Sequence, residues 1–187
     1  MLWMIVPFLL VIAQLQFHYG YQGLKPGQDF LVKVHLKDGW ETSAALAPSQ
    51  VSTRPSATLQ APDGLTVETP PVWIPSQREL AWRVRAEKWG DYALALRLGD
   101  QHYSKTVQVS PEVRRRSPVR LEPTFMNELL YPAEDPLPKG SPVSAITLGY
   151  PDGSVSVFGL GVNWLVLFFL LSAAFAFALR GRFGVTL

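Results

Sequence analysis

Residues 78–109 read RELAWRVRAEKWGDYALALRLGDQHYSKTVQV, and this stretch decides the fold. Apolar and polar side chains alternate in its first part, so that one face would carry Leu80, Trp82, Val84 and Ala86. A period of two is typical of a half-buried β-strand. Lys88-Trp89-Gly90-Asp91 and Gly99-Asp100 are turn sequences. We therefore expect three antiparallel strands joined as a meander.

Further strands are expected upstream of this stretch. From Gln28 onward the same alternation places four apolar side chains on one face, namely Phe30, Val32, Val34 and Leu36. Shorter apolar runs bounded by turn residues or prolines predict strands at Ala57–Gln60, Leu65–Glu68 and Val72–Ile74. The pattern predicts a mainly β fold, with an antiparallel β-sandwich of about seven strands over residues 24–110.

The segment Trp89-Gly90-Asp91-Tyr92-Ala93-Leu94 resembles the turn and tyrosine corner of immunoglobulin and fibronectin type III-like domains. In those domains a tyrosine two residues before an inward-facing position ties the loop to the sandwich. The resemblance implies an Ig-like domain with Tyr92 as the corner and with Trp82 and Leu94 in the core. Leu94 stands where an immunoglobulin domain carries cysteine, and this chain has no cysteine. A cysteine-free relative is therefore expected.

Residues 158–179 form an apolar run without a charged side chain. At about 1.5 Å of rise per residue, a helix of this length spans about 33 Å, enough for a hydrocarbon core of about 30 Å. Arg180 and Arg182 follow at once, and basic residues favour the cytoplasmic side. The run therefore predicts a transmembrane helix, with residues 180–187 as a cytoplasmic tail and the β domain on the extracytoplasmic side.

Residues 1–18 are a second apolar run, for which three interpretations stay open. A retained transmembrane helix or uncleaved signal anchor is favoured, with Phe17, Tyr19 and Tyr21 as an interfacial belt. A signal peptide would use Val11-Ile12-Ala13 as its cleavage sequence, although no basic residue precedes it. The run, about 24 Å long as a helix, could also be the end of a longer helix that starts upstream.

Small and polar side chains in the carboxyl-terminal run predict helix–helix contact. Ser172 and Ala176 are four residues apart, as are Ala174 and Ala178, and small residues at this spacing let another helix approach closely. Asn163 adds a polar group that costs less against a neighbouring helix than against lipid. We expect these residues to face the amino-terminal helix or another subunit; a lipid-facing helix is the alternative.

Residues 111–142 are expected to form a linker, followed by a β-hairpin at residues 143–157 that leads into the membrane helix. The linker carries a basic cluster that is a candidate contact for lipid headgroups or an acidic partner, with a solvated linker as the alternative: Arg114, Arg115, Arg116 and Arg120. It also carries a short amphipathic helix, which would rest on the sandwich or on the membrane surface, with an apolar face of Phe125, Met126, Leu129 and Leu130.

Composition and spacing argue against several classes of chemistry. The lack of cysteine excludes disulfides, thiolate metal sites and cysteine nucleophiles. The three histidines have no metal-binding spacing, and no serine lies in a nucleophile elbow. Glu134 and Asp135 are expected to be solvated in a loop. We therefore expect no enzyme activity, no metal and no cofactor. Glycan binding would require one shared face for Trp40, Trp73 and Trp89.

The high isoelectric point is no argument for a nucleic-acid partner. All acidic residues and all but two of the basic ones lie between Lys25 and Asp152, so this region has no net charge. The formal net charge of +2 therefore resides in Arg180 and Arg182, beside the predicted membrane helix. Interleaved aromatic residues typical of single-strand binding are also missing from the basic cluster.

A wider resemblance rests on short segments spread along the chain: Met4-Ile5-Val6-Pro7, Gln14-Leu15, Tyr19-Gly20-Tyr21, Lys25-Pro26-Gly27-Gln28, Leu130-Tyr131-Pro132-Ala133-Glu134 and Arg182-Phe183-Gly184-Val185. They look like a family of uncharacterised bacterial membrane proteins, similar in topological outline to Oxa1-type insertases. The resemblance implies the bacterial cytoplasmic (inner) membrane, with a periplasmic β domain and with membrane subunits and the lipid bilayer as partners.

We expect a non-catalytic accessory, scaffold or assembly subunit of a membrane protein complex. Two alternatives stay open: the carboxyl-terminal part of an Oxa1-like insertase or chaperone, and a cell-envelope module for an unknown small-molecule ligand.

Overall fold

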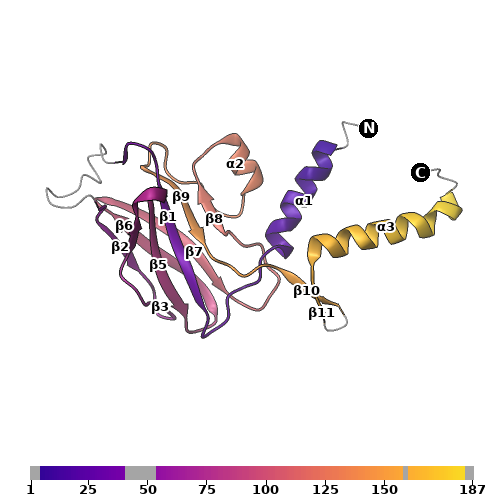
Figure 1. Cartoon of the computed structure of the whole chain (residues 1–187), viewed down its shortest axis with the longest axis horizontal. Coiled ribbons are helices and arrows are strands. Elements are labelled where there is room, and N and C mark those ends of the chain that lie inside the picture. The colour runs from indigo at the N-terminus through magenta and orange to yellow at the C-terminus, as the bar shows by residue number, and fades with distance from the viewer. Residues whose placement is uncertain (1–4, 41–53, 158–159, 184–187) are drawn as a thin grey trace.

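The computed structural model describes residues 5–40, 54–157 and 160–183. Within these ranges, the side chains of residues 5, 6, 17, 155–157, 160, 176 and 179–183 lie outside the description. The described chain is mainly β, with helices near its two ends and one short helix between late strands. Figure 1 shows the two larger sheets at one end of the molecule and the two terminal helices at the other.

The larger sheet is antiparallel and has the strand order β3-β5-β1-β9-β8, with β4 also paired to β5. Its strands are β1 (Asp29–Leu36), β3 (Leu65–Val67), β4 (Val72–Ile74), β5 (Glu79–Ala86), β8 (Val119–Leu121) and β9 (Val143–Leu148). The register pairs Val32 of β1 with Trp82 of β5 on one side and with Leu148 of β9 on the other. β1 and β5 therefore form the centre of the buried layer.

The smaller antiparallel sheet has the order β2-β6-β7, with β2 at Ala57–Gln60, β6 at Gly90–Leu98 and β7 at Gln101–Val109. Inward-facing side chains of both sheets belong to one hydrophobic core, which includes Val34, Leu80, Trp82, Leu94, Leu96, Val107 and Ile146. The predicted mainly β fold with antiparallel sheets is confirmed, and it is consistent with a β-sandwich.

The predicted meander is wrong at its first connection. β6 and β7 do form a hairpin, but β5 and β6 belong to different sheets, so the turn between them carries the chain from one layer to the other. The physical reason is that alternation reports which face of a strand is buried. It does not report which strand lies beside it, and the inward faces of β5 and β6 can be buried equally well across the core.

The predicted hairpin at residues 143–157 is also wrong. β9 lies inside the larger sheet between β1 and β8, whereas β10 (Ser154–Val157) pairs with β11 (Leu160–Asn163). Helix α3 (Trp164–Phe183) therefore begins later than the predicted start at residue 158, and it continues past the predicted end at residue 179. Residues 158, 159 and 184–187 lie outside the described residues.

The predicted linker at residues 111–142 is largely packed structure. It contains β8 and helix α2 (Phe125–Leu130), and its side chains Arg116, Ser117, Leu137 and Ser141 are buried. Thr124 caps α2 by accepting a hydrogen bond from the Asn127 backbone N–H at 3.2 Å. The segment continues the sandwich because its β8 strand adds an edge to the larger sheet.

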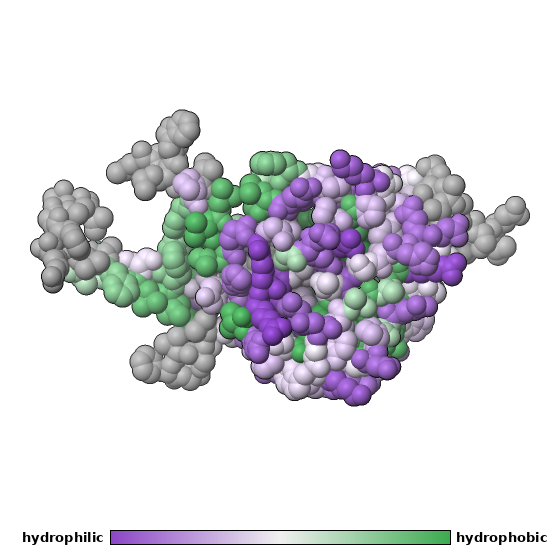
Figure 2. Space-filling view, turned by 180° about the vertical axis from the view of Figure 1, so that it is seen from behind, coloured by the Kyte–Doolittle hydropathy of each residue, from purple (hydrophilic) through white to green (hydrophobic). Residues whose placement is uncertain are grey.

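Helices α1 (Ile5–Tyr19) and α3 project from the same end of the sandwich (Figure 1). Figure 2 shows hydrophobic surface gathered over this helical end, while the face of the sandwich is mostly hydrophilic. Within the part of the chain that the structure describes, no helix combines the length and the hydropathy needed to cross a membrane. The two predicted transmembrane helices therefore stay predictions.

Candidate functional site

Helices α1 and α3 meet around Trp164, which opens α3 and is buried. The Trp164 indole Nε1–H donates to the Gln16 side-chain oxygen at 3.0 Å. The rings of Tyr19 and Trp164 have centroids 6.3 Å apart, and those of Phe8 and Phe168 are 6.4 Å apart. Among the described side chains, one hydrogen bond and two aromatic contacts thus join α1 to the first part of α3.

Gln14 joins α1 to the segment that was predicted to be a linker. Its side-chain nitrogen donates to the Leu129 carbonyl of α2 at 2.9 Å, and its side-chain oxygen accepts from Arg115 Nη2 at 2.6 Å. We did not predict roles for Gln14 and Gln16 from the sequence. The signal is their position as side-chain amides within an otherwise apolar helix, where a polar group needs a partner.

The outward sides of both helices are uncovered. Large apolar side chains are exposed on α1 (Phe8, Leu9, Val11, Tyr19) and on α3 (Val166, Phe169, Leu170, Leu171, Phe175, Phe177). Of the predicted helix-packing residues, Ser172, Ala174 and Ala178 are exposed as well, and the Ala176 side chain lies outside the described residues. Neither α1 nor the sandwich covers these small side chains.

Asn163 has a different role from the one predicted. It precedes α3, and its side-chain oxygen accepts a hydrogen bond from the Leu165 backbone N–H at 2.9 Å. Asparagine favours this position because its oxygen satisfies a backbone donor that lacks a helical partner. Its side chain therefore caps the helix, and this hydrogen bond explains its position without a neighbouring helix.

The basic cluster does not form a free surface. Arg116 is buried and donates to the carbonyls of Tyr21, Ser110, Glu112 and Arg114, and burial lowers the pKa of its guanidinium. Arg120 donates to the carbonyls of Ser104, Asp135 and Pro136. Arg114 is exposed and pairs with Glu112 and Asp91. Arg115 contacts Gln14, so each arginine ties this segment to another part of the chain.

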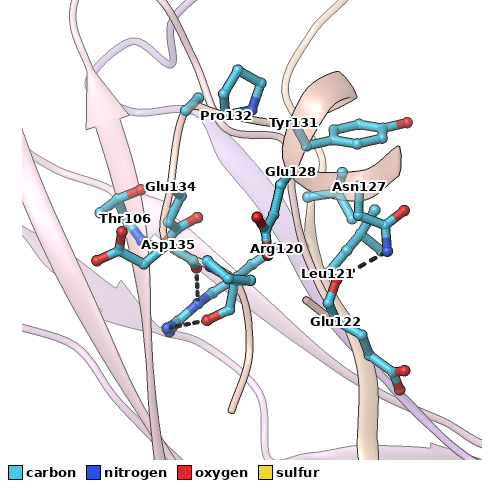
Figure 3. A pocket seen from close by; sticks show the side chains of 13 residues that line it. Thr106, Arg120, Leu121, Glu122, Asn127, Glu128, Tyr131, Pro132, Glu134 and Asp135 are labelled. Carbon is cyan, nitrogen blue, oxygen red and sulfur yellow. Dashed lines mark hydrogen bonds between the residues drawn. The ribbon is translucent and has the colours of Figure 1, made fainter. Parts of the chain in front are cut away.

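A cleft of about 490 Å³ lies between α2, β8 and the loop of residues 131–136 (Figure 3). Its polar lining includes Arg120, Glu122, Asn127, Glu128, Tyr131 and Asp135. Dashed lines in Figure 3 mark the hydrogen bonds that fix Arg120 to the 135–136 carbonyls and the Asn127 amide to the Glu122 carbonyl. The cleft is thus lined by positively and negatively charged side chains, and hydrogen bonds within the chain hold Arg120 and Asn127 in place.

Beneath the cleft, Lys105 of β7 is buried and forms an ion pair with Glu134. Lys105 also donates to the Ser117 carbonyl at 2.8 Å and to its hydroxyl at 3.0 Å. Glu134 accepts from the Thr106 backbone N–H at 2.9 Å and from the Ser117 hydroxyl at 2.7 Å. Desolvation by burial lowers the pKa of Lys105, and the Glu134 charge opposes that shift.

The prediction that Glu134 is a solvated loop residue is therefore wrong, whereas Asp135 is exposed. Both oxygens of the Glu134 carboxylate have partners within the chain. The network consequently fastens the 131–136 loop to β7 and Ser117. A general base needs an accessible acceptor near a substrate, and this carboxylate is buried and already occupied by its partners.

The residues of the predicted tyrosine corner and its core are Trp82, Tyr92 and Leu94. Trp82 and Leu94 are buried in the core. The Tyr92 hydroxyl donates to the carbonyls of Lys88 and Trp89, at 3.0 and 3.2 Å, and it lies against Gly64. These contacts fix the turn through which the chain passes from one sheet to the other.

Metal and glycan sites find no support among the described side chains. No three of their His, Cys, Asp and Glu residues lie close enough together to hold a metal ion. Trp40 is buried and packs edge-on against Trp73 with ring centroids 5.4 Å apart, whereas Trp89 is exposed elsewhere. The three tryptophans thus share no open face. No family model, no curated protein and no solved structure matches the chain.

Proposed function

We propose that this protein is a non-catalytic accessory or scaffold subunit of a membrane protein complex, anchored in a bacterial cytoplasmic membrane by α1 and α3. The observation that carries the proposal is the uncovered apolar surface of both helices at one end of the molecule (Figure 2). Soluble proteins rarely expose large contiguous apolar surfaces, and such surfaces mark contact with lipid or with other proteins.

The orientation follows from charge. Arg180 and Arg182 come directly after the apolar part of α3, and basic residues are favoured on the cytoplasmic side. The sandwich precedes α3 and therefore lies outside the cytoplasm. Contacts of Gln14 with α2 and Arg115 support a sandwich held close to the membrane surface.

The sandwich supplies the interaction module in this proposal. The Tyr92 contacts support an Ig-like or fibronectin III-like domain, in which loops and edge strands commonly dock partners. Among the described strands β4 pairs with β5 alone, so its other side is a candidate sheet edge. Its Val72 side chain is exposed. Another extended segment could add to this edge.

Membrane association and orientation can be tested together, because a chain without cysteine allows single-cysteine labelling. We expect the protein to stay in the membrane pellet after an alkaline carbonate wash. Lys139→Cys, at an exposed loop position, should react with a membrane-impermeant maleimide in intact spheroplasts. A cysteine added after Leu187 should react only after lysis. Recovery in the soluble fraction would contradict the anchor, and the reverse labelling would contradict the orientation.

A cell-envelope module for a small polar ligand is the second candidate, favoured by the cleft of about 490 Å³ beside α2. Clefts of this size with a few fixed polar groups suit small molecules. A ligand screen by thermal shift, with Asn127→Ala as the cleft variant, tests it. A ligand whose stabilisation is unchanged by Asn127→Ala would not use the cleft. The Oxa1-like interpretation stays a prediction.

A further inference from the structure

A groove of about 300 Å³ runs along α1 beside Arg115. Its lining is Leu10, Val11, Gln14, Leu15 and His18 of α1, together with Arg115 from the segment after β7. Residues three and four positions apart share one side of a helix, so these α1 side chains form one stripe. The stripe is apolar at Leu10 and Val11 and polar at His18, at the end of α1 nearest the sandwich.

Arg115 is half-buried beside this stripe, and none of the described carboxylates forms an ion pair with it. Its hydrogen bond to the Gln14 side-chain oxygen, at 2.6 Å, joins it to a neutral group. Its Nε–H is enclosed and lacks a hydrogen-bond partner among the described residues. Arg114, one position earlier, instead pairs with two carboxylates.

A guanidinium beside apolar surface is costly unless an anion neutralises it, and its planar donor set matches phosphate. His18, about one helical turn beyond Gln14 on α1, also lines the groove and supplies a further donor, its ring N–H. Of the remaining lining, Gln14 already has hydrogen-bond partners for both its side-chain nitrogen and its side-chain oxygen, and the other residues are apolar. This apolar part does not suit a free phosphate ion but does suit an acyl chain. The two ends of the groove therefore match the two parts of a phospholipid.

We propose that this groove binds one anionic phospholipid, with its phosphate at Arg115 and His18 and one acyl chain along Leu10, Val11 and Leu15. The inference rests on the proposed function, since it places the end of α1 at the headgroup layer. The lipid belongs to the leaflet on the sandwich side. An acyl chain gains little free energy when it moves from the bilayer into an apolar groove. The headgroup charge therefore sets the preference for this lipid.

Native mass spectrometry of the full chain, purified in mild detergent, tests the proposal with phosphatidylglycerol and phosphatidylcholine as probes. The wild-type chain should retain phosphatidylglycerol preferentially. Arg115→Gln should weaken that binding about tenfold, as expected for the loss of a charge-assisted hydrogen bond. Arg115→Lys should keep most of the preference, and Arg114→Gln is the matched control that should leave it unchanged. Val11→Trp, which fills the apolar part, should also weaken binding.

Three results would overturn the inference: equal retention of the two lipids by the wild-type chain, undiminished phosphatidylglycerol binding by Arg115→Gln, or equal affinity for soluble glycerol phosphate and the lipid. The last result would assign the site to a free phosphate compound. A carbonate wash of membranes that contain the wild-type or the Arg115→Gln chain, done before detergent is added, separates this inference from the proposed function. A variant that stays in the membrane and binds the lipid normally contradicts the lipid site alone, whereas a soluble wild-type chain contradicts the anchor.

Discussion

Lys105 lies at an inward-facing position of β7, between the buried side chains of Tyr103 and Val107. A buried ammonium group is tolerated only when a partner neutralises it and its donors are bonded. Glu134 and Ser117 satisfy both requirements. The pair joins two residues that are 29 positions apart in the chain. It therefore holds the 131–136 loop, which forms one wall of the cleft, in position.

Removing one member of this pair should be much more damaging than removing an exposed pair. We expect Lys105→Met to lower the free energy of unfolding by about 3–5 kcal/mol, because the Glu134 charge then stays buried without its cation. Lys105→Met combined with Glu134→Leu should recover part of that loss. Arg114→Gln, at an exposed pair, should change stability by less than about 1 kcal/mol. Chemical denaturation in detergent measures all three, and equal effects of Lys105→Met and Arg114→Gln would contradict the argument.

Tyr150 gives the structure a pH dependence at high pH. Burial raises the pKa of its phenol to about 12, although the hydrogen bond from the Gln108 backbone N–H, at 2.9 Å, favours the ionised form. The folded state therefore keeps this proton at pH values where the unfolded chain has lost it. From the ordinary pKa of 10.0 to about 12, the unfolded chain binds fewer protons, so stability falls as pH rises through this window.

Tyr150→Phe should remove this part of the pH dependence. At pH 7 we expect the variant to be less stable by about 1–2 kcal/mol, because the Gln108 N–H loses its acceptor. Between pH 10.0 and about 12 the wild-type chain should lose up to about 2–3 kcal/mol that the variant does not lose. Urea unfolding midpoints across that range give the comparison, and parallel curves for the two proteins would show that Tyr150 does not titrate in this way.

At the scale of elements, the crossing from β5 to β6 depends on the close contact between Tyr92 and Gly64. Gly64 has φ +105°, and a Cβ atom there would lie 2.3 Å from the Tyr92 hydroxyl oxygen. Gly27, with φ +83°, has a similar backbone requirement but open space around it. Alanine substitutions at these two glycines therefore distinguish the cost of backbone strain from the cost of a steric conflict.

Gly64→Ala should destabilise the chain by about 1–3 kcal/mol more than Gly27→Ala, since both variants strain the backbone and only the first meets Tyr92. Tyr92→Phe alone should cost about 1 kcal/mol through its lost hydrogen bonds to two carbonyls. Combining Gly64→Ala with Tyr92→Phe should cost less than the two separate effects together. Thermal unfolding measures the four variants, and strictly additive losses would argue against the contact.

The elements that the sequence predicts well are those that follow from local periodicity. Phe30 to Leu36 and Leu80 to Ala86 alternate as strands with one buried face, and they are strands β1 and β5. Pairing depends on contacts distant in sequence, so β9 could not be placed between β1 and β8 from its own residues. For the same reason the sequence predicts Arg116 as a contact for lipid headgroups or an acidic partner and does not reveal its burial, since the carbonyls that bind it lie in several segments.

The buried ion pair could have been inferred in part. Continuing the alternation of Tyr103, Val107 and Val109 places Lys105 on the inward face of β7, which requires a buried carboxylate. Several acidic residues were available, and local sequence does not say that Glu134 is the one. The cleft above the pair was not predictable either, because it arises only when α2 and the 131–136 loop pack beside β8.

At the scale of the whole molecule, charge and apolar surface are segregated between the two ends. The sandwich buries its own core and exposes ion pairs, whereas the helical end exposes phenylalanine and leucine side chains (Figure 2). A few contacts at Trp164 and Phe8 join α1 to α3, and the rest of α3 has no cover within the described chain. Either lipid alone or a further helix can cover the exposed part of α3. Substitution of the small side chains on α3 distinguishes these two cases.

Ser172 and Ala174 lie about 160° apart around α3, given about 100° of rotation per residue, so a single partner helix can pack on one of them and not on both. We expect one of the two variants Ser172→Phe and Ala174→Phe to lose the co-purifying partner in mild detergent, because a bulky side chain prevents close helix approach. The other variant then serves as the matched control for added bulk in lipid. Stoichiometric mass spectrometry of the purified complexes provides the readout. If both variants keep the wild-type set of partners, α3 faces lipid at these positions, and partners bind through α1 or the sandwich.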